Sequence, residues 1–483
     1  MGSTVVRTEG SGVSFARIRD EFGLPTDFPE VVLAEAADAV NTRLANRVDA
    51  TDLPLVTIDP PGAKDLDQAM AVERRANNGF RVHYAIADLG AFITPGGAID
   101  EEVRRRGQTL YLPDGNVPLH PTVLSEGAAS LLPEQVCPAA LWTLDCDADG
   151  ELETALVRRA LVRSRARFDY DTVQAAFAAG TAHPALEALP ALGRLRRERA
   201  IARGAVELQL PDQEVEPDGH GWQLVLRPRT DVDAWNAEIS LLTGMAAAKL
   251  MLGAGVGVLR TLPDPENGAV KWLRRSARSL GIAWPRAMDA AELLAGLDPD
   301  RPEALALFMD ATRLLRGAGY TVFDGQAPEL ATHAGIAAPY AHVTAPLRRL
   351  VDRYATEVCL ALSAEAPVPD WVRAALPELP GLMAGSDALA GKVDKACLDQ
   401  VEAWVLGNRI GQEFDAIVLR ADGTSAEVFV TDPPVISKCV GAHLPEGETV
   451  RVRLTHADAE ARKVVFEPAE RSDQFSTVPE EDR

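Results

Sequence analysis

TIDPPGAKDLDQAM, residues 57–70, places Asp59, Asp65 and Asp67 in a stretch broken by proline and glycine. Turn residues and carboxylates commonly share a solvated surface loop, and the three aspartates alone favour that interpretation. They also suit a metal site, because Mg²⁺ binds few carboxylates and leaves other positions to water and phosphate. In an extended chain, Asp65 and Asp67 would face the same side. Clustered anions are costly unless a cation compensates them, so the choice depends on the rest of the chain.

A second group of polar residues lies in THAGIAAPYAHVTAPLRRLVDRY, residues 332–354. Thr-Ala-Pro before Leu-Arg-Arg predicts a helix start, with Thr344 near the cap and Pro346 in the first turn. Arg348 and Arg349 would then lie at the amino end, where the helix dipole also favours an anion. Basic side chains disfavour an isolated helix at that end, so a bound phosphate explains them better.

The overall charge is a poor match to a nucleic-acid binder. The 483 residues carry a formal net charge of −22, whereas neutralising phosphates requires a basic surface. Arginine is nevertheless dense in residues 157–168, 193–203, 271–279 and 345–354. Each run suits the solvated face of a helix, and together they also suit a basic channel.

The sequence indicates a cytoplasmic protein. Its 5 cysteines form no CxxC pair, which fits a reducing compartment. The first residues lack the apolar core of a secretory signal, and no apolar run approaches the roughly 20 residues that span a bilayer. Neither a membrane nor an obligate protein partner is indicated.

Periodicity predicts helices and then a β-rich end. Helical spacing begins at 30–48, and extended runs follow at 53–59 and 81–89. Further helices are expected at 153–179, 184–203, 231–253, 267–281 and 302–317, loops at 366–371 and 376–381, and a long helix at 390–410. Residues 413–434 and 448–468 alternate as short strands, which predicts a small antiparallel barrel of the oligonucleotide-binding type.

The two polar stretches resemble the signature blocks of the RNase II/RNase R family, whose RNB domain carries TIDxxxxxDxDDA and a distal H-x-G…Y-x-H-x-T-S-P-x-R-R-x-x-D. Residues 22–33, 86–134 and 227–242 resemble its connecting segments in the same order. The similarity covers roughly residues 20–410, and the barrel occupies the place of the family's S1 domain.

The resemblance implies an α+β chain with five parts. These are an N-terminal lead-in with a helix (1–50), an RNB catalytic domain with a mixed sheet flanked by helices (51–389), a linking helix (390–411), an S1-like OB barrel (412–470) and a disordered tail (471–483). About fifty residues precede the acidic stretch, so no room is expected there for two cold-shock barrels.

The resemblance also implies an Mg²⁺-dependent exoribonuclease that degrades single-stranded RNA from the 3′ end to nucleoside 5′-monophosphates, with Mn²⁺ as a substitute metal. By position, Asp59, Asp65 and Asp67 would bind metal and water, with Asp65 and Asp67 also counted as catalytic. Arg348 would clamp the phosphate.

Four further residues are expected to bind RNA. Arg349 would support Arg348, Tyr111 would pack against the 3′-terminal nucleotides, and Glu238 would face the terminal ribose. Leu208 stands where the family commonly has an aromatic residue that stacks on the last base. For these positions a structural role is nearly as well supported, as it is for His333, His342 and Asp352.

One departure bears directly on activity. Gln68 replaces the family's usual fourth aspartate; its amide oxygen can ligate Mg²⁺ but brings no negative charge, so Gln68 stays a candidate ligand. Ala345 replaces a serine, which is a smaller change. The alternative to an enzyme is a catalytically impaired RNA-binding or regulatory protein with the RNB fold. A third interpretation, an unrelated hydrolase of small phosphoesters, does not explain the trailing barrel. Three retained aspartates together with Arg348 favour the exoribonuclease.

Overall fold

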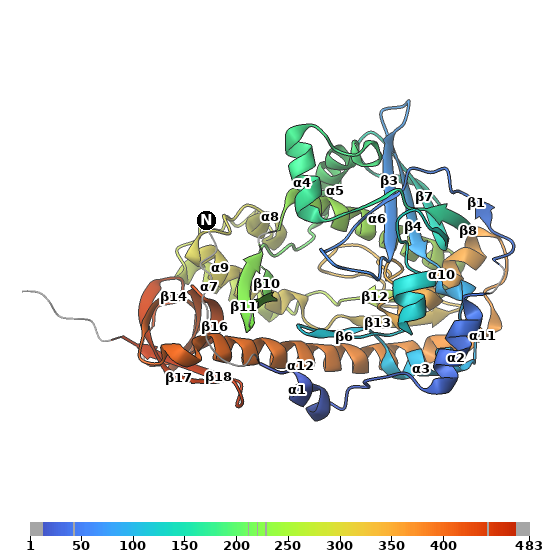
Figure 1. Ribbon diagram of the computed structural model, residues 1–483. Helices are drawn as coiled ribbons and strands as arrows, with labels where there is room; N and C mark the ends of the chain where they lie inside the picture. Colours follow the sequence, from blue (N-terminus) through green and yellow to red (C-terminus); the bar gives the residue numbers. More distant parts are fainter. Residues whose placement is uncertain are drawn as a thin grey trace, which may run out of the picture.

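The structure is a computed structural model that describes residues 13–41, 44–210, 212–219, 221–227, 229–441 and 444–469. The tail expected to be disordered, 471–483, lies outside these ranges, as do the first residues of the expected lead-in. The described chain forms a sheet domain with surrounding helices and a small closed barrel (Figure 1). This confirms the expected α+β class with an all-β barrel after the larger domain.

The elements follow one another along the chain in a mixed order. The helices are α1 Ala16–Glu21, α2 Glu30–Ala39, α3 Ala98–Arg106, α4 Tyr170–Ala179, α5 Leu189–Arg203, α6 Asp231–Ala254, α7 Asn267–Ser279, α8 Ala290–Ala295, α9 Pro302–Ala311, α10 Leu350–Ser363, α11 Asp370–Ala375 and α12 Leu379–Leu406. The strands of the larger domain are β1 Val48–Asp49, β2 Val56–Ile58, β3 Gln68–Arg74, β4 Phe80–Ala87, β5 Leu110–Leu112, β6 Gly115–Val117, β7 Val136–Cys146, β8 Leu152–Arg163, β9 Ala166–Phe168, β10 Asp212–Asp218, β11 Gly221–Arg227, β12 Val256–Thr261 and β13 Gly319–Asp324.

The main sheet has seven strands in the order β1-β8-β7-β4-β3-β2-β9. The neighbours from β8 to β2 pair antiparallel, whereas β1 and β9 pair parallel at the edges. Both runs expected to be extended contribute strands, since residues 53–59 contain β2 and residues 81–89 contain most of β4. Because β2 and β3 are adjacent and antiparallel, the acidic stretch between them lies at one end of the sheet.

The helix expected at 153–179 is wrong over its first half. Residues 152–163 form β8 and residues 166–168 form β9, so the helix is only α4. Val157, Ala160 and Val162 are buried on β8, and β8 pairs with β7 over most of its length. The ladder and the burial of this apolar set outweigh the local helix propensity of alanine, leucine and arginine. The arginines of this run therefore do not form a helix face.

Helix α6 packs with α10 against the main sheet, and its apolar residues belong to the same core. A capping box fixes its start, where the Thr230 hydroxyl accepts from the Asp233 N–H and the Asp233 side chain accepts from Thr230. Among the described residues α6 is the one helix apolar and long enough to cross a membrane, with half of that window buried. Charged residues interrupt this helix, and its apolar residues pack in the core of the sheet domain; a buried core helix meets the same criteria of length and composition.

Gly244, on α6, lets a distant segment approach the helix. A Cβ at this position would overlap the Tyr340 ring and crowd the Ala341 carbonyl oxygen. The Ala341 N–H donates to the Gly244 carbonyl oxygen at 3.1 Å. The missing side chain therefore helps to place the segment that leads into residues 344–349.

Helix α12 runs along one side of the molecule from the sheet domain to the barrel (Figure 1). It contains most of the helix expected at 390–410, but it begins much earlier, at Leu379, inside the stretch 376–381 that was expected to be a loop. Pro380 lies in the first turn, where a proline costs little because the N–H has no helical partner there.

The barrel that follows has five strands: β14 Glu413–Ala421, β15 Ser425–Thr431, β16 Pro434–Val440, β17 Thr449–Asp458 and β18 Lys463–Pro468. They close in the order β14-β15-β16-β18-β17, which confirms the expected barrel. β16 lies almost wholly outside the two stretches expected to form strands, and it pairs parallel with β18, so the barrel is not antiparallel throughout. Val428 and Val430 point into the barrel core, and Phe429 is also buried because Leu305 and Met309 of α9 cover its face. The barrel is thus packed against the helical part of the larger domain.

Candidate active site

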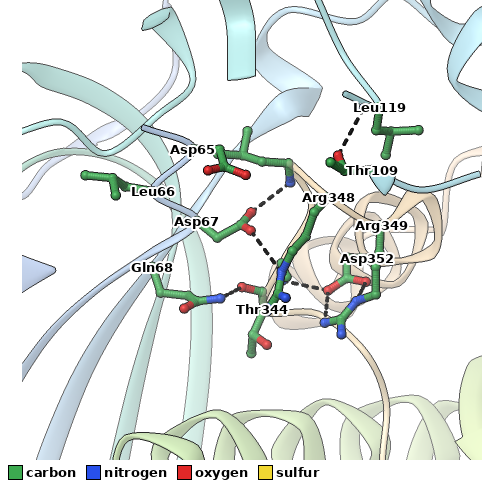
Figure 2. Close-up of polar contacts among 12 residues, drawn as sticks. Asp65, Leu66, Asp67, Gln68, Thr109, Leu119, Thr344, Arg348, Arg349 and Asp352 are labelled. Atoms are coloured by element: carbon green, nitrogen blue, oxygen red, sulfur yellow. Dashed lines mark hydrogen bonds and ion pairs between the residues drawn. The ribbon is translucent and has the colours of Figure 1, made fainter. Parts of the chain in front are cut away.

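The acidic stretch is anchored in the core between its carboxylates. Leu66 is fully buried, its N–H donates to the Ser130 hydroxyl at 2.9 Å, and its carbonyl oxygen accepts from the Leu131 N–H at 3.0 Å. Figure 2 shows Asp65 and Asp67 on either side of this anchor, next to one another and facing the segment that carries Arg348. The backbone on both sides of Leu66 is therefore fixed before any ligand binds.

Asp67 is the most buried of the three aspartates, with 4% of its surface exposed. Its Oδ1 accepts from the Leu347 N–H at 2.7 Å, and its Oδ2 lies 3.6 Å from the Arg348 Nε. Burial raises the pKa of Asp67 well above its usual value, and the charge of Arg348 opposes that shift. Asp67 thus joins the acidic stretch to the arginine segment across nearly three hundred residues of sequence.

Residues 344–349 form a turn, and the helix expected to start near Thr344 begins at Leu350 instead. The side chains of Asp352 and Gln68 form hydrogen bonds with backbone groups of this turn. The Asp352 Oδ1 accepts from the Ala345 N–H at 2.7 Å, and the Gln68 Nε2 donates to the Thr344 carbonyl oxygen at 2.5 Å (Figure 2). Carboxylates and an amide therefore fix this turn where the cap of a helix was expected.

Arg348 and Arg349 are neighbours with different surroundings. Arg349 donates through Nε and Nη2 to both oxygens of Asp352, at 2.8 and 2.9 Å, and Asp352 is fully buried. Burial lowers the pKa of Arg349, but Asp352 raises it above its usual value overall. The Arg348 side chain is 47% exposed, and its one ion pair among the described residues is the 3.6 Å contact of Nε with Asp67. Arg348 is therefore the one free to bind an anion.

Asp59 and Asp65 form the other side of the site. The Asp59 Oδ2 is buried and has no hydrogen-bond partner among the described residues. Burial, and then the charge of Asp65, raise the pKa of Asp59 to about 7. The Tyr111 hydroxyl donates to the Asp65 Oδ2 at 3.2 Å, and Tyr111 is about half exposed. Two neighbouring carboxylates without a cation are costly, which is the condition that a bound metal relieves.

The oxygen ligands suit Mg²⁺, although the described residues contain no group of three or more His, Cys, Asp or Glu placed to hold a metal ion together. Asp59 and Asp65 offer hard carboxylate oxygens, and Mg²⁺ commonly binds only one or two carboxylates, with water and phosphate completing its shell. Asp67 is already engaged with the turn. Gln68 uses its amide nitrogen on Thr344, and its role as a ligand stays a prediction.

Two residues expected at the RNA lie in other surroundings. Glu238 on α6 is 6% exposed, and its Oε2 lies 4.0 Å from the Nε of buried Arg196. Burial raises the pKa of Glu238, while Arg196 and Arg203 lower it. Leu208 is partly buried and packs on the small core formed by α7, α8 and α9. In the part of the chain that the structure describes, neither pairs with or packs on the acidic stretch, so their roles at RNA stay predictions.

The histidines of residues 332–354 pack among aromatic rings. His333, Tyr340, His342 and Tyr320 contact one another edge to face, with centroids 5.4–6.3 Å apart. The Tyr320 hydroxyl and the His342 Nδ1 are 2.8 Å apart, and burial lowers the pKa of His342 well below its usual value. This is the packing role that the sequence left open.

Sequence reasoning missed Tyr170, the first residue of α4. Its hydroxyl accepts from the Asn236 Nδ2 at 3.2 Å. Burial raises the pKa of Tyr170 to about 12, and the charge of Asp59 adds to the shift, so this phenol lies near the acidic stretch. The signal was the cap of α4, where the Asp169 side chain accepts from the Thr172 N–H, but the helix expected at 153–179 concealed it.

Two family models match the chain. The RNB domain matches residues 47–362, and the RNase II-type exonuclease C-terminal S1 domain matches residues 412–469. Ribonuclease R of Escherichia coli (strain K12) is 29% identical over 352 residues, which are 68% of this chain and 42% of that protein. The chain thus matches less than half of the length of that relative.

Solved structures share the fold at low identity. RNase R of Mycoplasma genitalium in complex with ribose methylated single-stranded RNA has a TM-score of 0.83 at 18% identity, over 94% of this chain and 77% of that one. Yeast Ssd1, described as a pseudonuclease, has a TM-score of 0.68 at 16% identity, over 84% and 52%. The fold alone therefore does not decide between a nuclease and a pseudonuclease.

Proposed function

Since this chain belongs to the RNase II/RNase R family of RNB-domain proteins with a C-terminal S1 domain, we propose that it is an Mg²⁺-dependent 3′-to-5′ exoribonuclease that hydrolyses single-stranded RNA to nucleoside 5′-monophosphates. The observation that carries the proposal is the separation of charge around Asp67. Asp59 and Asp65 lie on one side without an ion pair among the described residues, and one oxygen of Asp59 also lacks a hydrogen-bond partner there. The half-exposed guanidinium of Arg348 lies on the other side. A phosphodiester with a divalent cation complements both sides.

Each residue has a role that follows from its surroundings. Asp59 and Asp65 would hold the cation, and Asp67 keeps the Arg348 turn against them through the Leu347 N–H. When bound, an Mg²⁺ ion would lower the pKa of a water nucleophile and polarise the phosphate. Arg348 donates to the phosphate and stabilises the charge that develops as the 3′ oxygen leaves. Tyr111 offers an exposed ring beside Asp65, where the terminal nucleotide would stack.

The test uses 5′-labelled oligo(A) and its DNA equivalent, incubated with the purified protein in Mg²⁺, Mn²⁺ or EDTA. We expect stepwise shortening of the RNA, release of AMP and no reaction in EDTA. Products are sized on a denaturing gel and identified by chromatography. Internal cleavage, or full activity in EDTA, would contradict the proposal.

A second candidate function is an RNA-binding protein with the same fold that does not cut. Gln68 favours it, because one expected carboxylate is absent and its amide nitrogen is committed to Thr344. This candidate predicts retention of RNA on a native gel without shortening in either metal. Rescue of cutting by Mn²⁺ would exclude it.

The partner and the compartment are part of the same proposal. Single-stranded RNA is the expected partner, and a cytoplasmic location fits the 5 cysteines, which are all free and buried. Mass spectrometry of the native protein without reductant should find 5 thiols.

A further inference from the structure

The short hairpin β5–β6 presents different residues on its two faces. Leu110 and Leu112 are buried, whereas Tyr111 between them is 45% exposed, as the alternation of a strand requires. The buried face belongs to the hydrophobic cluster that α12 and the barrel share. The exposed face carries the Tyr111 hydroxyl to Asp65. Whatever fixes the buried face therefore fixes Tyr111 at the candidate site.

Helix α12 packs against β5 of the hairpin, and helix α1 packs against α12. Its residue Ile18 and the preceding Phe15 are buried in the same cluster as Leu110 and Leu112. This N-terminal segment is itself tied to other elements: the Trp222 Nε1 donates to the Val13 carbonyl oxygen at 3.1 Å. Helix α1 therefore belongs to the same core as α12 and the buried face of the hairpin.

Arg19 on α1 contacts the tip of the hairpin directly. Its Nη1 and Nη2 donate to the two carboxylate oxygens of Asp114, at 2.8 and 2.7 Å, and Nη2 also reaches the Gly115 carbonyl oxygen at 3.2 Å. Asp114 is the last residue of the two-residue turn between β5 and β6. The Arg19 side chain is 20% exposed and the Asp114 side chain 34%, so the pair is partly accessible to solvent. A bidentate guanidinium–carboxylate pair also fixes orientation, which a single contact does not.

The same hairpin is joined to the arginine turn. The Thr109 N–H, one residue before β5, donates to the Arg348 carbonyl oxygen at 3.0 Å. Gln108 and Arg349 form an isolated antiparallel bridge, and the Leu350 N–H donates to the Gly107 carbonyl oxygen at 3.0 Å. These contacts hold the chain just before the hairpin against the arginine turn, whereas Arg19 acts at the opposite end, on the tip.

We propose that Arg19 is a positioning residue of the proposed exoribonuclease: through Asp114 it fixes the β5–β6 hairpin so that Tyr111 stays over Asp65 for the terminal nucleotide of the RNA. The proposal rests on the function proposed above, because it assigns Tyr111 to the substrate. Within the described residues Arg19 pairs with none of the three aspartates of the acidic stretch and not with Arg348. Its effect on the site would therefore pass through the hairpin.

The test compares Arg19→Ala with Arg17→Ala, a matched control on the same helix. Arg17 pairs with Glu460, which lies in the turn between β17 and β18, and both side chains are largely exposed. Within the described residues Arg17 forms no hydrogen bond or ion pair with the hairpin. Hydrogen–deuterium exchange of residues 110–117 is measured in both variants without RNA. We expect faster exchange of the hairpin in Arg19→Ala and wild-type exchange in Arg17→Ala. Unchanged hairpin exchange in Arg19→Ala would overturn the proposal.

Kinetics then ask whether the effect passes through Tyr111. We expect Arg19→Ala to lower kcat/KM for oligo(A) about tenfold, since small misplacements of a positioning group are costly. In a Tyr111→Ala background the same substitution should cost less than twofold, because the group that it positions is gone. Equal losses in both backgrounds would contradict the proposal. The charge exchange Arg19→Asp with Asp114→Arg should restore at least half of the lost activity, and this variant keeps the proposal testable if Arg19→Ala folds poorly.

Failure of the proposed function would look different. If the wild-type protein binds 5′-fluorescein oligo(A) in EDTA but never shortens it in Mg²⁺, the proposed exoribonuclease activity is wrong. The double-mutant cycle of Arg19 and Tyr111 is then read from binding anisotropy instead of kcat/KM. Additive losses of affinity would still overturn the role of Arg19, and non-additive losses would support it.

Discussion

The two sides of the candidate site, the arginine turn and the acidic stretch, differ in whether their carboxylates are paired. On the arginine turn, Asp352 is fully buried and is satisfied by Arg349 and by the Ala345 N–H. On the acidic stretch, neither Asp59 nor Asp65 forms an ion pair within the described residues, and one oxygen of Asp59 has no hydrogen-bond partner there. The first arrangement builds the turn. The arrangement on the acidic stretch leaves carboxylates that a bound ligand, such as a metal ion, would neutralise.

The difference also separates two adjacent arginines. The Arg349 guanidinium pairs with Asp352, whereas the Arg348 side chain is half exposed beside Asp67. A residue type in a motif therefore does not state its role, because the role depends on which partner the fold brings to it. Asp67 lies between the two sides and is the residue on which both depend.

The strongest challenge to this comparison is Asp67→Asn. The asparagine oxygen can still accept from the Leu347 N–H, so the turn should keep its place while the charge beside Arg348 is lost. We expect turnover of labelled oligo(A) to fall about 10³-fold, with RNA binding reduced far less. Single-turnover assays and anisotropy measure the two quantities. Near-normal hydrolysis would show that the charge of Asp67 is not needed.

Replacing each arginine by alanine sharpens the contrast between them. Arg349→Ala leaves the Asp352 carboxylate buried and unpaired, so it should lower the free energy of unfolding by about 3 kcal/mol and reduce Tm clearly. Arg348→Ala should leave Tm nearly unchanged and slow hydrolysis about 10²-fold. Thermal unfolding and oligo(A) assays on both variants give the comparison. Equal losses of Tm would mean that the two arginines share one structural role.

Metal addition tests whether the acidic side is really uncompensated. Mg²⁺ at about 100 times its Kd should stabilise the folded protein by about 2.7 kcal/mol. Asp59→Asn and Asp65→Asn should reduce this stabilisation, whereas Asp415→Asn on the exposed face of β14 should not. Differential scanning fluorimetry with and without Mg²⁺ measures it. A Tm that does not respond to Mg²⁺ in the wild-type protein would contradict a metal site between these carboxylates.

Gln68→Asp is expected to have the smallest effect, about fivefold on rate or on the Mg²⁺ concentration required. An aspartate adds a carboxylate to the acidic side but removes the donor to the Thr344 carbonyl oxygen, so the two consequences oppose each other. Gln68→Met, which lacks both the charge and the donor, is the control. If Gln68→Asp changes neither rate nor Mg²⁺ dependence, position 68 is not a ligand site.

Much of the fold could be read from local pattern. Alternation predicted four of the barrel strands, β14, β15, β17 and β18, and helical spacing predicted α5, α6 and α7. It did not predict β16, whose parallel pairing with β18 closes the barrel. Pattern failed at β8, where arginine and alanine disguise a strand whose partner lies earlier in the chain. It also failed at Thr344, because the groups that replace a helix cap there come from Gln68 and Asp352.

The sequence by itself determined the family, the barrel and the candidate residues Asp59, Asp65, Asp67 and Arg348, because motif order and periodicity are properties of the chain. Only the tertiary structure decided which charged side chains are paired within the protein and which are free to bind a ligand. Pairing depends on distances between segments that are hundreds of residues apart, and no spacing in the sequence encodes those distances. That is why Arg348 and Arg349 look equivalent in the sequence and differ in the folded protein, and why Arg19 came into view only beside Asp114.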